Sequence, residues 1–107
     1  MVAVKLGCPY YCRVTLTSQA RVATDRPGRY IKQLCDHLGR RIDTEYDDTR
    51  GRVTLAAGTC VLTAEDGALL MRATADDAET LARLEDVVGR HLERFGTRDE
   101  LTVTWVR

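Results

Sequence analysis

The chain has 107 residues, in which 16 lysines and arginines balance 16 aspartates and glutamates. This length fits one domain with a single core and is too short for a two-domain cleft enzyme. The zero net charge argues against nucleic acid or an anionic membrane as a partner. The sequence holds no apolar run of roughly 18 residues that would span a membrane and no export signal near its start, so we expect a cytoplasmic protein with reduced cysteines.

The start of the chain predicts a leader and then a first strand. Residues 1–17 have little pattern, and we expect a disordered or strand-forming leader ahead of a single domain spanning 18–107. From Val14 to Thr24, apolar residues mixed with threonines favour one or two strands, with an irregularity near Ser18 and Gln19.

A first helix is predicted after this strand. Thr24 and Asp25 offer an N-cap, Pro27 suits the first helical turn, and Gly39 ends the helix. One helical face carries the apolar side chains Ile31, Leu34, Cys35 and Leu38.

The middle of the chain predicts a β-meander, because short alternating segments are separated by turn residues. The expected strands lie at about residues 42–46, 53–55, 60–64 and 68–75. The expected turns lie at Asp47 to Gly51, around Ala57–Gly58 and at Asp66–Gly67. Asp-Gly between alternating segments is a strong hairpin signal.

The last third predicts a long amphipathic helix from Ala78 to Phe95, a stop at Gly96 and a final strand over residues 101–106. Helices near both ends and antiparallel strands between them favour an α+β two-layer sandwich with both helices on one face of a mainly antiparallel sheet. The predicted order is β-α-β-β-β-β-α-β. We expect the strand from Asp43 to Asp47, which has outward-facing acids, to lie at or near an edge.

Cysteine and histidine suggest two kinds of site, and both meet objections. Cys8 and Cys12 resemble a redox dithiol, but three residues separate them and no helix begins at Cys8 to lower the thiol pKa. Cys35, His37, Cys60 and His91 are a potential zinc set. Residues two apart on a helix point about 200° away from each other, so Cys35 and His37 cannot face one ion on a regular helix.

His91 is the one ionisable residue at the edge of the apolar stripe of the second helix. Such a histidine is usually satisfied by a backbone carbonyl or a neighbouring acid. A functional role needs a pocket between helix and sheet and an acid nearby, and of Glu85 and Glu93 only Glu85 borders the stripe.

Arginines crowd around the first helix. Arg26 and Arg29, with Arg21, Arg40 and Arg41, form a cluster that could bind an anion at the helix N-terminus. Alternatively they are a solvated face, partly neutralised by the acids Asp43, Glu45, Asp47 and Asp48.

Several runs of the chain have a familiar form. They are ARVATDRPGRY (residues 20–30), KQLCDH (32–37), GTC (58–60), LEDVV (84–88), RHLERF (90–95) and Trp105. Together they resemble the bacterial family catalogued as domain of unknown function 2218, over about Ser18 to Arg107. The resemblance implies no activity. In that family the domain occurs alone or attached to siderophore-interacting flavoprotein reductases, which implies an accessory role near iron uptake.

We therefore predict a small cytoplasmic binding or interaction module that pairs with itself or with a siderophore-interacting reductase. We expect no cofactor, since the sequence has no catalytic constellation or glycine-rich phosphate loop. The candidate ligand-binding residues are His91, Cys35, His37, Cys60, Arg26 and Arg29. The alternative is a small enzyme or metal-binding accessory factor that uses His91 with Cys35 or Cys60.

Overall fold

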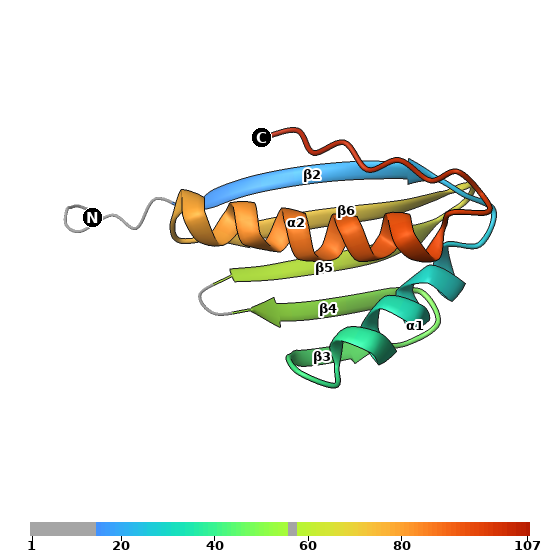
Figure 1. The fold of residues 1–107 in the computed structure, drawn as a ribbon, viewed down its shortest axis with the longest axis horizontal. Coiled ribbons are helices and arrows are strands. Elements are labelled where there is room, and N and C mark those ends of the chain that lie inside the picture. Colours follow the sequence, from blue (N-terminus) through green and yellow to red (C-terminus); the bar gives the residue numbers. More distant parts are fainter. Residues whose placement is uncertain (1–14, 56–57) are drawn as a thin grey trace.

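The fold is an antiparallel sheet with two helices on one of its faces, as a computed structural model shows (Figure 1). The structure describes residues 15–55 and 58–107. Most of the predicted leader, the Cys8–Cys12 pair and Ala57 of one predicted turn lie outside the described residues. In chain order the elements are β2 (Leu16–Ala23), α1 (Pro27–Leu38), β3 (Asp43–Tyr46), β4 (Arg50–Leu55), β5 (Gly58–Glu65), β6 (Ala68–Ala75) and α2 (Ala78–Phe95).

The sheet has the strand order β2-β6-β5-β4-β3, and every neighbouring pair is antiparallel. Helix α2 lies over β2, β6 and β5, and α1 lies over β3, β4 and β5 (Figure 1). The predicted α+β two-layer sandwich is confirmed, and so is the place of β3 at an edge. Within the described ranges, neither helix has the length and apolar composition needed to cross a membrane.

The start of the domain differs from the prediction in two details. β2 is one regular strand that pairs with β6 without a break, so the predicted irregularity near Ser18 is wrong. The N-cap of α1 is Arg26, and the Thr24 hydroxyl accepts a hydrogen bond from the Arg26 amide at 3.1 Å. Pro27 is the first helical residue, and its ring disfavours a helical conformation in the residue before it, which fixes the boundary at Arg26.

The β5–β6 hairpin turns at Asp66–Gly67 as predicted. Gly67 has a φ of 78°, a left-handed conformation that glycine adopts without the steric cost that a Cβ atom brings. The regular pairing from Glu65–Ala68 to Gly58–Ala75 follows from this turn.

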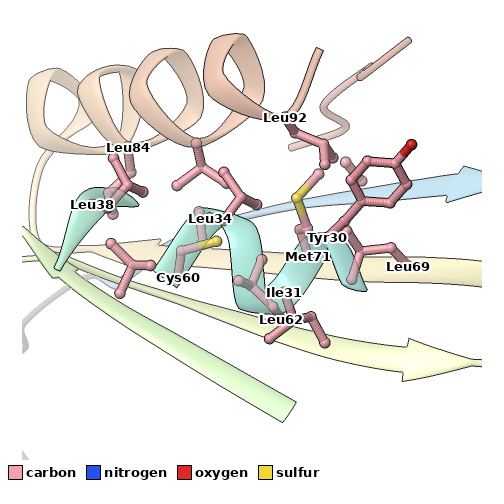
Figure 2. Close-up of a cluster of buried hydrophobic side chains, with 14 of the residues drawn as sticks. Tyr30, Ile31, Leu34, Leu38, Cys60, Leu62, Leu69, Met71, Leu84 and Leu92 are labelled. Atoms are coloured by element: carbon pink, nitrogen blue, oxygen red, sulfur yellow. The ribbon is translucent and has the colours of Figure 1, made fainter. Parts of the chain in front are cut away.

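The core lies between the helices and the sheet (Figure 2). Ile31 and Leu34 of α1 and Leu84 of α2 are completely buried. They meet the sheet residues Cys60, Leu62, Leu69 and Met71, which are buried as well. Burial of a leucine or isoleucine side chain stabilises the fold by about 1.5–3 kcal/mol each, so these apolar stripes hold both helices on one face of the sheet.

The C-terminal segment forms turns over residues 96–100 and then runs along β2 over residues 101–107 without forming a full strand (Figure 1). Its one β-bridge joins Val106 to Gln19, with backbone N–O distances of 2.9 and 2.8 Å on the outer edge of β2. The amide of Val103 donates to the Glu93 carboxylate of α2 at 2.9 Å. The predicted strand over 101–106 is therefore reduced to one bridge near its end, and the segment before the bridge is bound to α2 as well.

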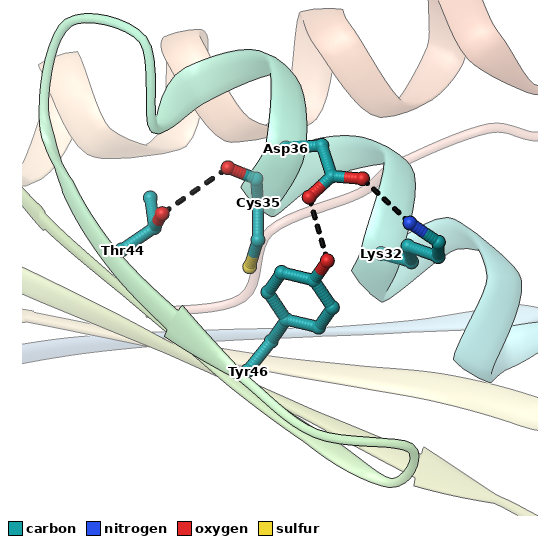
Figure 3. A network of polar contacts seen from close by, with 5 residues as sticks. All are labelled: Lys32, Cys35, Asp36, Thr44 and Tyr46. Carbon is teal, nitrogen blue, oxygen red and sulfur yellow. Dashed lines mark hydrogen bonds and ion pairs between the residues drawn. The ribbon is translucent and has the colours of Figure 1, made fainter.

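A polar network joins α1 to the edge strand β3 (Figure 3). The Asp36 carboxylate accepts hydrogen bonds from Lys32 at 2.8 Å and from the Tyr46 hydroxyl at 2.6 Å. Beside it, the Thr44 hydroxyl donates to the Cys35 carbonyl at 3.1 Å. The bonds from Lys32 and Tyr46 lower the pKa of Asp36. They also fix β3 against the helix.

Gly51 in β4 gives the first testable prediction. A Cβ atom at this position would lie 2.8 Å from Ile31 Cγ2 and 3.1 Å from Cys35 Sγ. We expect Gly51→Ala to lower the free energy of unfolding by about 1–3 kcal/mol, because α1 would have to move from the sheet. Urea unfolding followed by circular dichroism measures this loss. Arg72→Ala, on the exposed face of β6, is the control, and an equal loss in both variants would contradict the close-contact argument.

Candidate functional site

The six candidate residues fall into three places. His37 and His91 meet where α1 and α2 approach each other. Cys35 and Cys60 are buried in the core. Arg26 and Arg29 are exposed at the start of α1.

The two histidines form a side-chain contact between the helices. Their ring centroids are 5.0 Å apart, and the ring planes are tilted by 43°. Phe95 also packs on His37, edge to face, with a centroid distance of 5.4 Å and an angle of 79°. His37 is exposed by total area and His91 is partly buried, so the pair lies at the protein surface.

One hydrogen bond defines the chemistry of His91. Its Nδ1 lies 2.6 Å from the Val87 carbonyl oxygen. Because a carbonyl only accepts, Nδ1 carries the hydrogen and the Nε2 lone pair of the neutral ring is free for another partner. Glu85 and Glu93, the two acids that could have paired with His91, bind other groups. Glu93 accepts the Val103 amide, and Glu85 binds the Arg107 guanidinium at 2.8 and 3.1 Å.

A cleft of about 500 Å³ adjoins the histidine pair. We call it the two-histidine cleft, and its lining residues are His37, Leu38, Arg40, Arg41, Ile42, Leu55, Val87 and His91. Four of these side chains are aliphatic, two are guanidinium groups and two are imidazoles. Its polar side-chain groups are therefore the guanidinium donors of Arg40 and Arg41 and the imidazoles of His37 and His91.

Sequence reasoning noted Arg40 and Arg41 but grouped them with the arginines at the other end of α1. In the structure they belong to the turn after α1, which brings them to the histidines. The helical period of α1 predicts that His37 and Cys35 lie on different faces of the helix. It does not predict the direction of the turn after the helix, which decides whether Arg40 and Arg41 lie near His91. The cleft was therefore missed.

The cysteines lie in a different environment. Cys35 Sγ points from α1 to the sheet (Figure 3) and lies 3.9 Å from the Glu45 carbonyl oxygen. Burial raises the pKa of Cys35 to about 11 and that of Cys60 to about 12. Within residues 15–55 and 58–107, no three His, Cys, Asp or Glu side chains are grouped to hold a metal ion.

The start of α1 carries acid as well as arginine. A hollow of about 380 Å³ there is lined by Arg26 and by Asp99 of the C-terminal segment. The Tyr30 hydroxyl donates to Asp99, and this bond is the main reason that the pKa of Tyr30 is raised. The predicted neutralising acids also have other partners, since Glu45 pairs with Arg52 of β4 and Asp47 accepts amide bonds from Thr49 and Arg50.

The fold and this arrangement define a small α+β domain with a cleft where the end of α1 and the turn after it approach α2. Residues 19–106 match the model of a family described as "Uncharacterized protein conserved in bacteria (DUF2218)". The chain belongs to this family, as the resemblance implied.

A solved structure is similar to this chain over most of the chain's length. It is the NMR structure of PA4090 from Pseudomonas aeruginosa, with 30% sequence identity and a TM-score of 0.72. The match covers 84% of this chain and 94% of that chain. No protein with a curated description matches the sequence.

The raised thiol pKa values give a second prediction. In a variant with Cys8→Ser and Cys12→Ser, we expect Cys35 and Cys60 to resist Ellman's reagent at pH 8, because the thiolate is the reactive form and neither thiol is exposed. Both should react after unfolding in urea. Rapid labelling of the folded variant would contradict this account.

The same shifts predict how stability depends on pH. Between the ordinary thiol pKa of 9.0 and the folded values of about 11 and 12, the unfolded chain loses thiol protons that the folded chain retains. The thiols therefore lower the free energy of unfolding as pH rises above 9. Urea titrations at pH 8 and pH 10 measure the fall, and Cys60→Ala should make it smaller than in the parent protein.

Proposed function

We propose that this protein is a binding module that holds a small organic molecule in the two-histidine cleft. The observation that carries the proposal is the meeting of His37 and His91, from different helices, on the lining of one largely aliphatic cleft. Apolar pockets with a few convergent polar groups are typical of small-molecule sites, and about 500 Å³ lies within the usual size range.

Binding fits the cleft better than catalysis does. A histidine that acts as a general base is normally oriented by an acid or a carbonyl and faces a nucleophile or a bound water. Here His91 is oriented by the Val87 carbonyl, but the residues lining the cleft include no Ser, Cys, Asp or Glu. The arrangement holds a polar group in place and supplies no second reacting group.

The alternative of a metal-dependent factor built on His91 with Cys35 and Cys60 has less support. Both thiols are buried and hold their protons, whereas zinc binds the thiolate. Their side chains contribute to the core, and neither belongs to the lining of the cleft.

We further propose that the module acts in the cytoplasm, beside a siderophore-interacting flavoprotein reductase. The support is the context of the family to which the chain belongs. In this role the cleft would hold a small molecule for the reductase. A mixture of the two proteins, analysed by size-exclusion chromatography with and without a ferric siderophore, tests the association, and separate elution under both conditions would contradict it.

Substitutions in the cleft test the binding proposal. In a thermal-shift screen of small organic acids, amines and neutral aromatic compounds, at least one compound should raise the Tm of the wild-type protein. His91→Ala should reduce that shift because it removes the ordered imidazole, and Val87→Trp should abolish it by filling the cleft.

Arg83→Ala is the matched control for these variants. Arg83 is an exposed residue of the same helix, outside the cleft lining, so its substitution should leave the shift unchanged. Circular dichroism and the Tm without ligand establish that each variant is folded. A shift that persists in folded Val87→Trp would place the ligand elsewhere and overturn the proposal.

A further inference from the structure

We infer that the ligand of the two-histidine cleft is an organic acid, in which a carboxylate is attached to a flat apolar body. This inference rests on the proposed function and names its ligand class. The geometry assigns the carboxylate to Arg40 and Arg41, and the apolar body to the aliphatic lining beside the imidazole rings.

The charge of the cleft is the first argument. Arg40 and Arg41 are exposed lining residues, and among the described residues neither makes an ion pair within 4 Å. The nearby acid Asp36 is bound to Lys32 and Tyr46, and Arg40 acts on it by charge alone, without an ion-pair contact. Guanidinium groups match a carboxylate with paired hydrogen bonds, so two unpaired arginines over one cleft favour an anion.

The end of α1 does not oppose an anion as a bare helix C-terminus would. The carbonyl ends of a helix carry partial negative charge, which disfavours an anion. Here the Leu38 carbonyl accepts hydrogen bonds from the amides of Arg41 and Ile42 at 3.0 and 2.9 Å, and the Cys35 carbonyl accepts from Gly39 at 2.8 Å. The turn that brings the arginines to the cleft thus satisfies these carbonyls.

The apolar lining is the second argument, and it excludes a bare inorganic anion. Leu38 is 7% exposed, and Ile42, Leu55 and Val87 are partly buried around the same cleft. Transfer of apolar ligand surface to such a lining stabilises a complex by roughly 25 cal/mol per Å². A ligand that uses the whole cleft therefore carries an apolar portion.

The imidazoles indicate that this apolar portion is flat. The His37 ring packs against Phe95 and His91, so two neighbouring rings of α2 hold its orientation. Aromatic rings pair best by offset stacking or edge-to-face contact, worth about 0.5–1.5 kcal/mol beyond burial. An aromatic or conjugated ring in the ligand extends this set of rings.

A second hollow lies next to the cleft. It has a volume of about 540 Å³ and is lined by Arg90, His91, Glu93 and Arg94, so His91 borders both hollows. The one acid in this set, Glu93, accepts the Val103 amide, and Arg90 pairs with Asp86 at 2.8 Å. The charges around this second hollow therefore largely cancel, and the positive charge beside the cleft comes from Arg40 and Arg41.

Four probes of known structure test the inference by isothermal titration calorimetry. They are 2-naphthoate, 2-naphthylmethanol, 2-naphthylmethylammonium and acetate, of which the first three share one ring system and differ in charge. We expect 2-naphthoate to bind at least tenfold more tightly than the alcohol, and the ammonium and acetate to bind more weakly still.

The double substitution Arg40→Gln and Arg41→Gln separates charge from shape. It should weaken 2-naphthoate at least tenfold and leave the affinity for 2-naphthylmethanol unchanged. Arg83→Gln with Arg98→Gln is the matched control, since it removes the same charge from exposed residues outside the cleft lining and should change neither affinity. Unchanged circular dichroism and Tm show that both double variants fold.

The outcomes separate this inference from the proposed function. Equal binding of naphthoate and naphthylmethanol, or tightest binding of the ammonium, overturns the acid assignment. If that binding is lost in Val87→Trp, the cleft remains a ligand site and the proposed function stands. If no probe and no compound of the thermal-shift screen binds in a manner sensitive to Val87→Trp, both proposals fail.

Discussion

The close approach of α1 to β4 at Gly51 is the contact on which the arrangement of the helices depends. With no side chain there, Ile31 and Cys35 lie directly on the sheet, and the helix is held near the edge strand β3. The bonds from Tyr46 and Thr44 then fix the last turns of α1. As a result, the end of α1 points to α2, and His37 reaches His91. The buried Gly51 thus helps to position the histidine pair at the surface, although it does not contact either histidine.

The packing of α1 on the sheet gives a cysteine and a histidine of the same helix different environments. Cys35 and His37 are only two residues apart, yet one lies in the core and the other on the surface against α2. Burial makes the thiol a small apolar group, whereas exposure leaves the imidazole free for exchange with solvent and ligand. The histidine pair, and not the cysteines, therefore belongs to the part of the molecule that can recognise another molecule.

Most of the fold could be predicted from sequence, because it follows from local patterns. A helical period predicts the apolar stripe of α2, and the alternation of a strand predicts the outward acids of β3. One turn conformation predicts the hairpin at Asp66–Gly67. What could not be predicted depends on contacts between distant residues. The last predicted strand is reduced to the bridge between Val106 and Gln19, and Arg41 is placed by a turn in which the Leu38 carbonyl accepts the amides of Arg41 and Ile42. His91 lies between these cases: a backbone carbonyl was its expected partner, whereas His37 was grouped with it only in a potential zinc set that also needed the cysteines.

The C-terminal segment also decides how the sheet ends. Sheet edges present unpaired backbone groups that can recruit a strand from another molecule. At one edge the segment lies beside β2 and bonds to it through Val106 (Figure 1), while Arg107 is held to α2 by Glu85. At the other edge β3 is only four residues long and carries Asp43 and Glu45, and a short edge strand with charged side chains is a poor template for a further strand. One edge is thus partly covered by the protein's own chain and the other is short and charged, and both features disfavour growth of the sheet into a continuous assembly.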